Sequence, residues 1–419
     1  MKNNMSKLTK LEKYWILYDV GNSAFILLVS TIIPIYFKNI AAANGISAAN
    51  STAYWGYAIS ISTLIVAILG PTLGTLADTR GYKKPLFTAL LMLGVLGCAS
   101  LSMNLTWIAF LFVFVIAKVG VSGSIIFYDA MLADVTTDDR MDMLSSLGYA
   151  WGYIGSCIPF TLSLVLILFA EKLSLTSGTA TKIAFIINAL WWLVVSGPLL
   201  KNYEQLHYIE AEKDAMKKAM QRLKETFQNI KGQKEIFTFL LAFFFYIDGV
   251  YTIIEMATSY GKDVGIQDNS LLLALLLTQV VAFPFAILFG KLSKKYKTKD
   301  LINVAIIGYF LIALFALQLD KAWEFWFLAV CVAMFQGAVQ ALSRSYFAKI
   351  IPKDKSSEYF GFYDIFGKGA SFTGAFLMGL TTQISGSSKT GVGLIAVMFV
   401  IGFFIFNKAV KMKGDTPLV

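Results

Sequence analysis

The sequence is poor in charge and in the residues that enzymes most often use for catalysis. Asp, Glu, Lys and Arg make up 15% of the 419 residues, and the chain has one histidine. It contains no Gly-x-x-x-x-Gly-Lys-[Ser/Thr] phosphate loop and no metal-ligand spacing, so neither ATP hydrolysis nor a metal centre is indicated. We therefore expect no enzymatic activity and no cofactor.

The few cysteines and the histidine give little support to a chemical role. Cys98, Cys157 and Cys331 all fall inside apolar runs, so we expect core residues rather than a disulfide framework. His207 lies in a polar stretch, where a single histidine is expected to be solvated.

What the chain does have is apolar surface in excess of what a soluble protein can carry. Apolar residues make up 57% of the sequence and the mean hydropathy is +0.66. These values indicate a polytopic membrane protein. The net charge of +10 could suggest a nucleic-acid partner. The cations lie in short loops between apolar segments, however, which is the pattern of membrane topology, and we expect no nucleic-acid binding.

Twelve apolar segments are long enough to cross a bilayer as helices, for which about 20 residues suffice. The segments span about 14–37, 53–77, 86–103, 107–128, 144–169, 183–200, 236–260, 271–289, 301–319, 323–347, 360–382 and 392–406. The polar stretch 201–234 separates the first six from the last six, and its spacing of apolar residues predicts an amphipathic helix. We predict an all-α membrane protein with a six-helix bundle at 1–200, a cytoplasmic linker at 201–234 and a second six-helix bundle at 235–419.

The distribution of positive charge predicts the orientation. Most Lys and Arg residues lie on one set of loops and tails, and the opposite set carries only Lys38, Lys172, Lys182, Lys262, Lys321 and Lys389. Because cytoplasmic loops are enriched in Lys and Arg, both termini are predicted inside. We expect a multi-pass protein of the cell inner (plasma) membrane, and a monomer.

A short basic loop joins the second and third predicted helices. Its sequence, from Gly74, is Gly-Thr-Leu-Ala-Asp-Thr-Arg-Gly-Tyr-Lys-Lys. Asp78 ends a helix here and could dock on the N-terminus of a neighbouring helix. The order of residues closely resembles the loop signature of the major facilitator superfamily of transporters. We expect Asp78 and Arg80 to act as a cytoplasmic latch.

The two halves repeat one another. The basic loop recurs from Gly290 at an offset of 216, without its acid, and the segment from Ala133 recurs from Ala348 at an offset of 215. Two six-helix bundles, related by an axis along the membrane normal, would produce this repeat, with a substrate path between them.

Charged and amide side chains inside the predicted spans are the candidate functional residues. A charge at mid-membrane costs at least about 2.5–3.5 kcal/mol, so such residues usually face a cavity. The candidates for substrate binding or coupling are Asp19, Asn22, Lys118, Asp248, Tyr251, Glu255, Gln336, Gln340 and Lys368. The candidates for gating are Asp78, Arg80, Asp129, Arg344 and Asp364.

Each candidate also has a structural reading. Asp364 and Lys368, four residues apart, could simply neutralise one another. Asp19 lies near a helix end, where an interfacial role is as plausible as transport. Asp248 and Glu255 lie deeper and are the candidates for a proton carrier, unless they pair with a buried lysine.

Several stretches together resemble one branch of the superfamily, the vacuole-effluxer-like permeases related to the fungal autophagy-linked amino-acid exporters. They are Tyr18–Phe25, Tyr246–Val250, Gln336–Ser345 and Phe360–Tyr363 with Gly367 and Lys368. The resemblance implies twelve helices, no ATPase activity and the movement of small solutes, with amino-acid efflux as the role of the fungal relatives. The segment Gly152–Pro159 lacks the Gly-Pro pattern of drug/proton antiporters.

Two functions remain open from the sequence. The first is a secondary active transporter for a small polar or zwitterionic, amino-acid-like solute, acting by alternating access and coupled to protons or another ion. The second is a lipid-handling protein, such as a flippase for single-chain lipids, or a non-transporting membrane sensor. Membrane lipids are expected contacts in both.

Overall fold

The computed structural model describes residues 8–211, 214–228, 233–263, 268–385 and 388–412, and these residues form helices joined by short loops. They fall into two compact units. Unit 1 comprises Met1–Thr136, Trp151–Ala219 and Asp354–Gly361; unit 2 comprises Thr137–Ala150, Met220–Lys353 and Phe362–Val419. The predicted boundaries at residues 200 and 235 stay a prediction.

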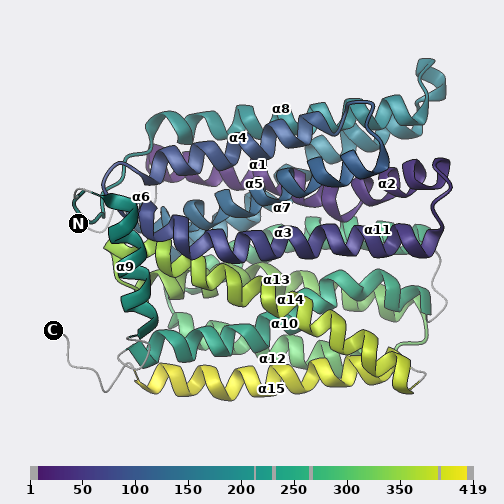
Figure 1. Cartoon of the computed structure of the whole chain (residues 1–419). Coiled ribbons are helices and arrows are strands. Elements are labelled where there is room, and N and C mark those ends of the chain that lie inside the picture. Colours follow the sequence, from purple (N-terminus) through teal and green to yellow (C-terminus); the bar gives the residue numbers. More distant parts are fainter. Residues whose placement is uncertain (1–7, 212–213, 229–232, 264–267, 386–387, 413–419) are drawn as a thin grey trace. The chain divides into compact units, whose positions relative to one another are not determined.

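Unit 1 is built mainly from the first half of the sequence (Figure 1). Its helices are α1 (Lys10–Ser30), α2 (Ile32–Ala43), α3 (Ala48–Ala77), α4 (Lys83–Ser100), α5 (Trp107–Ala130), the short α6 (Leu132–Val135) and α8 (Ser177–Asn202). The helix α7 (Met141–Leu168) belongs to unit 1 from Trp151 onward, while its first turns belong to unit 2.

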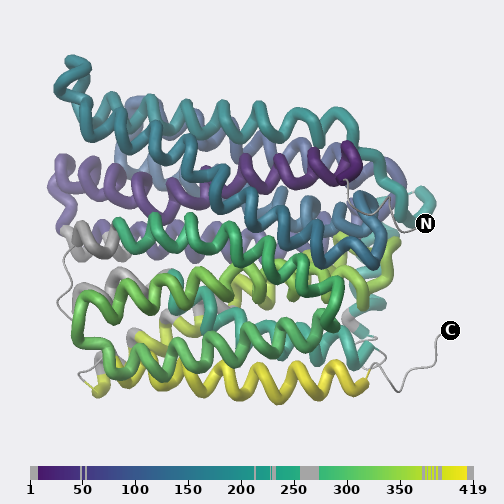
Figure 2. The backbone as a smooth tube through the Cα atoms, turned by 180° about the vertical axis from the view of Figure 1, so that it is seen from behind, coloured from purple at the N-terminus to yellow at the C-terminus, as the bar shows by residue number. Residues whose placement is uncertain are grey.

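Unit 2 is built mainly from the second half (Figure 2). Its helices are α10 (Lys234–Asp263), α11 (Asp268–Leu292), α12 (Thr298–Ala316), α13 (Ala322–Ile350) and α15 (Ser388–Met412). The helix α14 (Ser356–Ser385) belongs to unit 2 from Phe362 onward, and its first turns belong to unit 1. The helix α9 (Ala215–Gln228) spans the boundary between the units.

The helices have the length and composition of membrane spans. Among the described residues, eleven segments are long and apolar enough to cross a bilayer. The 30-residue α14 is the further long helix at the position of the eleventh predicted span. The all-α membrane fold predicted from the sequence is therefore confirmed.

The two units repeat the same packing scheme. In unit 1, α4 packs against α5 and α8, α1 against α8, and α3 against α5. In unit 2, α12 packs against α13 and α15, α10 against α15, and α11 against α13. Each pair in unit 1 thus has a counterpart six spans later. This agrees with the sequence repeat at an offset of about 215 residues.

Two local features differ from the prediction. The first span is not continuous, because α1 ends at Ser30 and α2 begins at Ile32. Pro34 explains the break, since it lacks the N–H that would bond to the Ser30 carbonyl and its ring clashes with that group. The linker also differs: within its described residues, Ala215–Gln228 are helical as predicted, whereas residues 203–211 are not helical.

The contact between α4 and α5 depends on glycine. A Cβ atom at Gly120 would lie 2.2 Å from the backbone nitrogen of Gly94, and one at Gly97 would lie 2.8 Å from Ala117. Small residues allow helix backbones to approach closely in membranes, where lipid provides no hydrophobic drive for association.

We predict that Gly120→Ala lowers the thermal unfolding temperature of the purified protein, because an inserted methyl group in a tight contact costs about 1–3 kcal/mol. The matched control is Gly56→Ala in α3, where an added Cβ would meet no atom within 4 Å. Fluorescence-detected unfolding in detergent measures both variants. Equal unfolding temperatures for the two would show that the contact between α4 and α5 tolerates a side chain.

Candidate functional site

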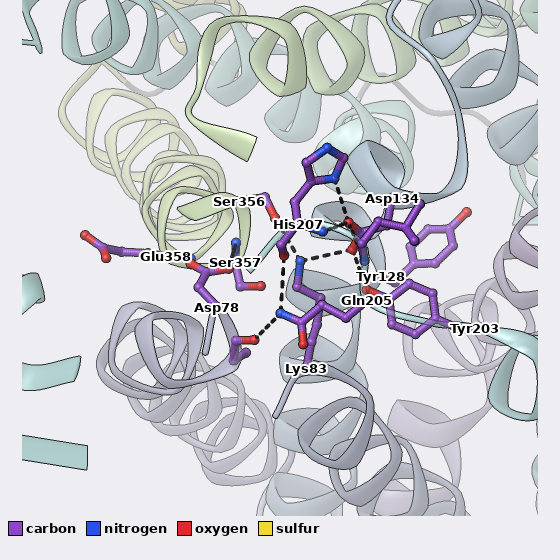
Figure 3. A network of polar contacts seen from close by, with 12 residues as sticks. Asp78, Lys83, Tyr128, Asp134, Tyr203, Gln205, His207, Ser356, Ser357 and Glu358 are labelled. Carbon is purple, nitrogen blue, oxygen red and sulfur yellow. Dashed lines mark hydrogen bonds and ion pairs between the residues drawn. The ribbon is translucent and has the colours of Figure 1, made fainter. Parts of the chain in front are cut away.

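The first turn of α14 is held in unit 1 by Asp78, which follows the last residue of α3. Its two carboxylate oxygens accept the backbone N–H groups of Ser357 at 2.8 Å and Glu358 at 2.9 Å (Figure 3). The first N–H groups of a helix have no partner within the helix, and the helix dipole favours negative charge there. The carboxylate of Asp78 thus caps α14.

The approach of α14 to α3 requires glycine at position 74. A Cβ atom there would lie only 2.4 Å from the backbone oxygen of Ser357. Any other residue would therefore force the start of α14 away from Asp78. Gly74 and Asp78, the glycine and the acid of the loop signature, therefore both support the contact between α3 and α14.

Lys83 makes a second connection to the same turn. Its side chain is fully buried, and its Nζ atom lies 3.2 Å from Oδ2 of Asp134 and donates to Oγ of Ser356 at 3.0 Å. A buried ion pair costs desolvation energy, and further hydrogen bonds are needed to offset it. Ser356, the first residue of α14, provides one of these hydrogen bonds.

Asp134 is the centre of the network in Figure 3. Besides Lys83, it accepts hydrogen bonds from the hydroxyl of Tyr203 at 2.5 Å and from the backbone N–H of His207 at 2.9 Å. Nδ1 of His207 lies 2.9 Å from Oδ1 of Asp134. The prediction that His207 is simply solvated is wrong, because the chain that follows α8 turns back onto α6.

The two buried acids of the network titrate differently. Burial raises the pKa of Asp78 to about 7, although Lys83 and the N–H donors of Glu358 and Ser357 lower it. For Asp134 burial also raises the pKa, but Lys83 and the hydrogen bonds from His207 and Tyr203 outweigh it, so the pKa lies below its usual value. Asp134 therefore stays ionised near neutral pH, whereas Asp78 can exchange a proton there.

Residues after α8 run alongside the loop that carries Asp78. The N–H of Ile209 donates to the Asp78 carbonyl at 2.8 Å, and the N–H of Arg80 donates to the Ile209 carbonyl at 2.9 Å. The side chain of Arg80 is exposed: it lies over the ring of Tyr208, 5.0 Å from its centroid, and 3.4 Å from the Glu210 carboxylate. Asp78 and Arg80, predicted to act together, thus contact different partners.

Unit 2 holds the first turns of α7 in a corresponding way. Here the acid comes from the docked helix itself: Asp142 accepts the hydroxyls of Ser345 and Thr298, both at 2.6 Å, and lies 2.7 Å from Nζ of Lys349. A Cβ atom at Gly290 would lie 2.8 Å from Cβ of Ser146. The repeated glycine is needed in both units, and the acid missing from the second loop is replaced by Asp142.

Arg344 adds to the hold on α7. Its Nε atom donates to Oγ of Ser145 at 2.9 Å and its guanidinium group lies 4.5 Å from the ring centroid of Tyr149. Oγ of Ser145 donates in turn to the Ala341 carbonyl at 2.7 Å. Arg344, predicted as a gating residue, therefore lies where α7 meets α13 within unit 2.

Asp248 lies inside unit 2, on α10, and is fully buried. Its Oδ1 atom accepts the backbone N–H of Gly374 at 2.9 Å and the hydroxyl of Thr252 at 3.3 Å. A Cβ atom at Gly374 would lie 2.2 Å from both side chains, so glycine lets α14 approach the acid. The same helix α14 carries the ion pair between Asp364 and Lys368, whose charged atoms are 2.5 Å apart.

The other candidate transport residues of unit 2 lie on α10 and α13. Gln336 is buried, and its backbone carbonyl accepts a hydrogen bond from the side-chain amide of Gln340 at 3.1 Å. Tyr251 is half-buried on α10. The side chain of Glu255 lies outside the described residues.

In unit 1, the candidate residues lie on α1 and α5. Asp19 and Asn22 are buried on α1, Asp129 is buried near the end of α5, and Lys118 is half-buried in its middle. Next to Asp19, the Tyr18 hydroxyl donates to Oγ of Ser124 at 2.7 Å. Tyr246 and Ser343 form the same 2.7 Å pair in unit 2.

Residues that could hold a metal ion are not gathered anywhere in the described part of the chain. The residues that sequence reasoning missed are Lys83, Asp134 and Tyr203 in unit 1 and Asp142 in unit 2. Lys83 was visible as part of the loop signature, and Asp134 as the acid in the repeated segment after the fourth span. Tyr203 gave no signal, because its partner is 69 residues away in the sequence.

Comparison with known proteins places these features in a family. The family described as "Vacuole effluxer Atg22 like" matches residues 9–415. The chain is 45% identical to YxiO of Bacillus subtilis, described as an MFS-type transporter, over 99% of this chain and 100% of that protein. It is 23% identical to autophagy-related protein 22 of Saccharomyces cerevisiae, over 88% of this chain and 86% of the yeast protein.

Solved structures with the same fold are major facilitator superfamily (MFS) transporters. The human organic anion transporter MFSD10 aligns with a TM-score of 0.71 at 13% identity, over 94% of this chain and 98% of that one. The proton:xylose symporter XylE aligns with a TM-score of 0.71 at 14% identity, over 95% and 94% of the two chains. Sequence and fold agree, and the chain belongs to the Atg22-like family of MFS-type transporters.

Proposed function

We propose that the chain is a secondary active transporter that moves a small polar or zwitterionic, amino-acid-like solute by alternating access, with protons as the coupling ion. The observation that carries this proposal is the buried carboxylate of Asp248. We further propose that it acts as a monomer in the plasma membrane, with both termini in the cytoplasm.

The depth of Asp248 supports a transport role. It lies about 21 Å along α10 from Lys234, on the helical rise of 1.5 Å per residue, whereas the hydrocarbon core is about 30 Å thick. An ionisable group at such a depth is costly and usually functional. The hydrogen bond to Gly374 ties the carboxylate to α14, so a change in its charge would alter the contact between α10 and α14.

Both signs of charge are available at this depth in unit 2. Lys368 lies about 18 Å along α14 from Ser356 and pairs with Asp364. A zwitterionic solute needs an anion and a cation as partners, and the ion pair on α14 could open to supply them.

We predict that Asp248→Asn abolishes accumulation driven by a pH gradient but leaves exchange intact, because the amide keeps the size of the side chain and cannot release a proton. Proteoliposomes with radiolabelled L-amino acids measure both activities. The control Asp300→Asn makes the same change in the first turn of α12, outside the hydrocarbon core.

Full gradient-driven uptake by Asp248→Asn would rule out this carboxylate as the proton carrier. If the wild-type protein moves fluorescent single-chain lipids between leaflets and no amino acid, the lipid-handling alternative replaces the proposal.

We propose that the first turns of α14 and α7 act as gates on the predicted cytoplasmic side, where most Lys and Arg residues lie. In unit 1, Asp78 and Lys83 hold α14; in unit 2, Asp142 and Arg344 are the corresponding residues for α7. The two backbone N–H groups that Asp78 accepts support its proposed role as a latch. Protonation of its carboxyl would remove the negative charge that the helix dipole favours at the start of α14.

We predict that Asp78→Asn releases the first turn of α14, because an amide has one acceptor oxygen for two N–H donors. The reporter is Ser357→Cys in a variant without the three native cysteines, since Ser357 is fully buried and its backbone N–H is retained. Labelling of inside-out vesicles with a membrane-impermeant maleimide should be at least about tenfold faster, equivalent to the loss of about 1.4 kcal/mol.

The matched control is Asp354→Asn, which makes the same change at an exposed acid just before α14. Equal labelling rates for Asp78→Asn and Asp354→Asn would contradict the latch. Both variants must first show the elution profile of the wild-type protein on size exclusion.

A further inference from the structure

A groove of about 850 Å³ lies on unit 1, next to the network around Asp134, with which it shares Tyr203. One wall is the turn from α3 to α4 and the first part of α4, with Arg80, Lys84 and Met92. The other wall is the segment after α8, with Tyr203 and Tyr208. The proposed transport cycle makes no use of this groove.

The charged residues that line the groove are Arg80 and Lys84, from the turn before α4 and its first turn, and Glu204, from the segment after α8. The guanidinium group of Arg80 packs on Tyr208, and Nζ of Lys84 donates to the Lys201 carbonyl at 3.2 Å. One acid, Glu204, also lines the groove, and the Glu210 carboxylate lies 3.4 Å from the Arg80 guanidinium group. Both side chains of that pair are exposed, and exposed ion pairs contribute only about 0–1 kcal/mol, so a phosphate can replace Glu210 at Arg80. Arg and Lys together at a membrane surface suit a phosphate group.

The remainder of the groove is apolar and follows α4 into the span. Pro85, Ala89 and Met92 line it at helical spacing, and Leu93 and Leu96 continue the exposed apolar strip along the same helix. Lys83–Ser100 is one of the candidate membrane spans, so Lys84 lies at the end of a span and the apolar part of the groove lies within it. From Lys84 to Met92 the groove descends about 12 Å along the axis.

We propose that this groove binds a membrane glycerophospholipid, with its phosphodiester held by Arg80 and Lys84 and an acyl chain against Ala89 and Met92. A free phosphate ion would satisfy the two cations but would leave the apolar part of the groove unused. None of the candidate residues for substrate binding or coupling lines this groove.

The position of the groove connects it to the latch. Arg80 follows Asp78 by two residues, and its backbone N–H bonds to Ile209, whose own N–H bonds to the carbonyl of Asp78. Tyr203 lines the groove and donates to Asp134. A bound lipid would therefore rest against both chain segments that support the network.

The test uses the full-length protein in detergent and measures retention of dioleoylphosphatidylglycerol by native mass spectrometry. Arg80→Gln combined with Lys84→Gln should weaken lipid binding about tenfold or more, since each cation near a membrane surface contributes about 1 kcal/mol. The matched control, Lys294→Gln with Lys295→Gln, removes two exposed lysines from the corresponding loop of the second repeat and should leave binding unchanged.

A second variant separates a lipid from a soluble phosphate. Ala89→Trp fills the apolar part of the groove at an exposed position and should also weaken lipid binding about tenfold, with Arg80 and Lys84 in place. Equal lipid affinity in the wild type and the Arg80/Lys84 variant would overturn the proposal. So would displacement of the lipid by millimolar inorganic phosphate together with normal binding by Ala89→Trp, which would indicate a site for phosphate alone.

Discussion

One constraint underlies the contacts on the predicted cytoplasmic side: the backbone N–H groups at the buried start of a helix need hydrogen-bond acceptors. Ser356, Ser357 and Glu358 begin α14 and are all fully buried, so their N–H groups cannot reach water. An unsatisfied buried donor costs about 1–3 kcal/mol, and Asp78 supplies acceptors to two of them. The carboxylate comes from the α3–α4 loop, so α3 must approach α14 closely, which requires glycine at position 74. Lys83, at the start of α4, bonds to Ser356 of the same turn.

The second unit meets the same constraint with different residues. Its loop after α11 has no acid, and α7 brings Asp142 in its own first turn, where the helix dipole also favours negative charge. The partners are two hydroxyls and one lysine rather than backbone donors. The repeat thus preserves the close approach at Gly74 and Gly290, while the chemistry of the two contacts differs.

Charge within the membrane follows a related principle. Asp248 is tolerated because Gly374 allows α14 close enough to donate a backbone hydrogen bond, and Asp364 is neutralised by Lys368 one turn away. Each arrangement couples the charge state of a side chain to the packing of α14. The helix whose first turn is held by Asp78 is therefore also the helix that faces the buried charges of unit 2.

The sequence by itself determined the helices, because an apolar run of about 20 residues has one stable conformation in a bilayer. It also determined local contacts such as Asp364 with Lys368, since residues four apart share a helix face. Pro34 alone does not predict the break between α1 and α2, because Pro71, Pro159, Pro198 and Pro284 lie inside continuous helices. Only the tertiary structure decided that His207 contacts Asp134 and that Gly374 meets Asp248, because these partners are separated by 73 and 126 residues. Such pairings depend on how the helices pack, and no periodicity along the chain encodes that.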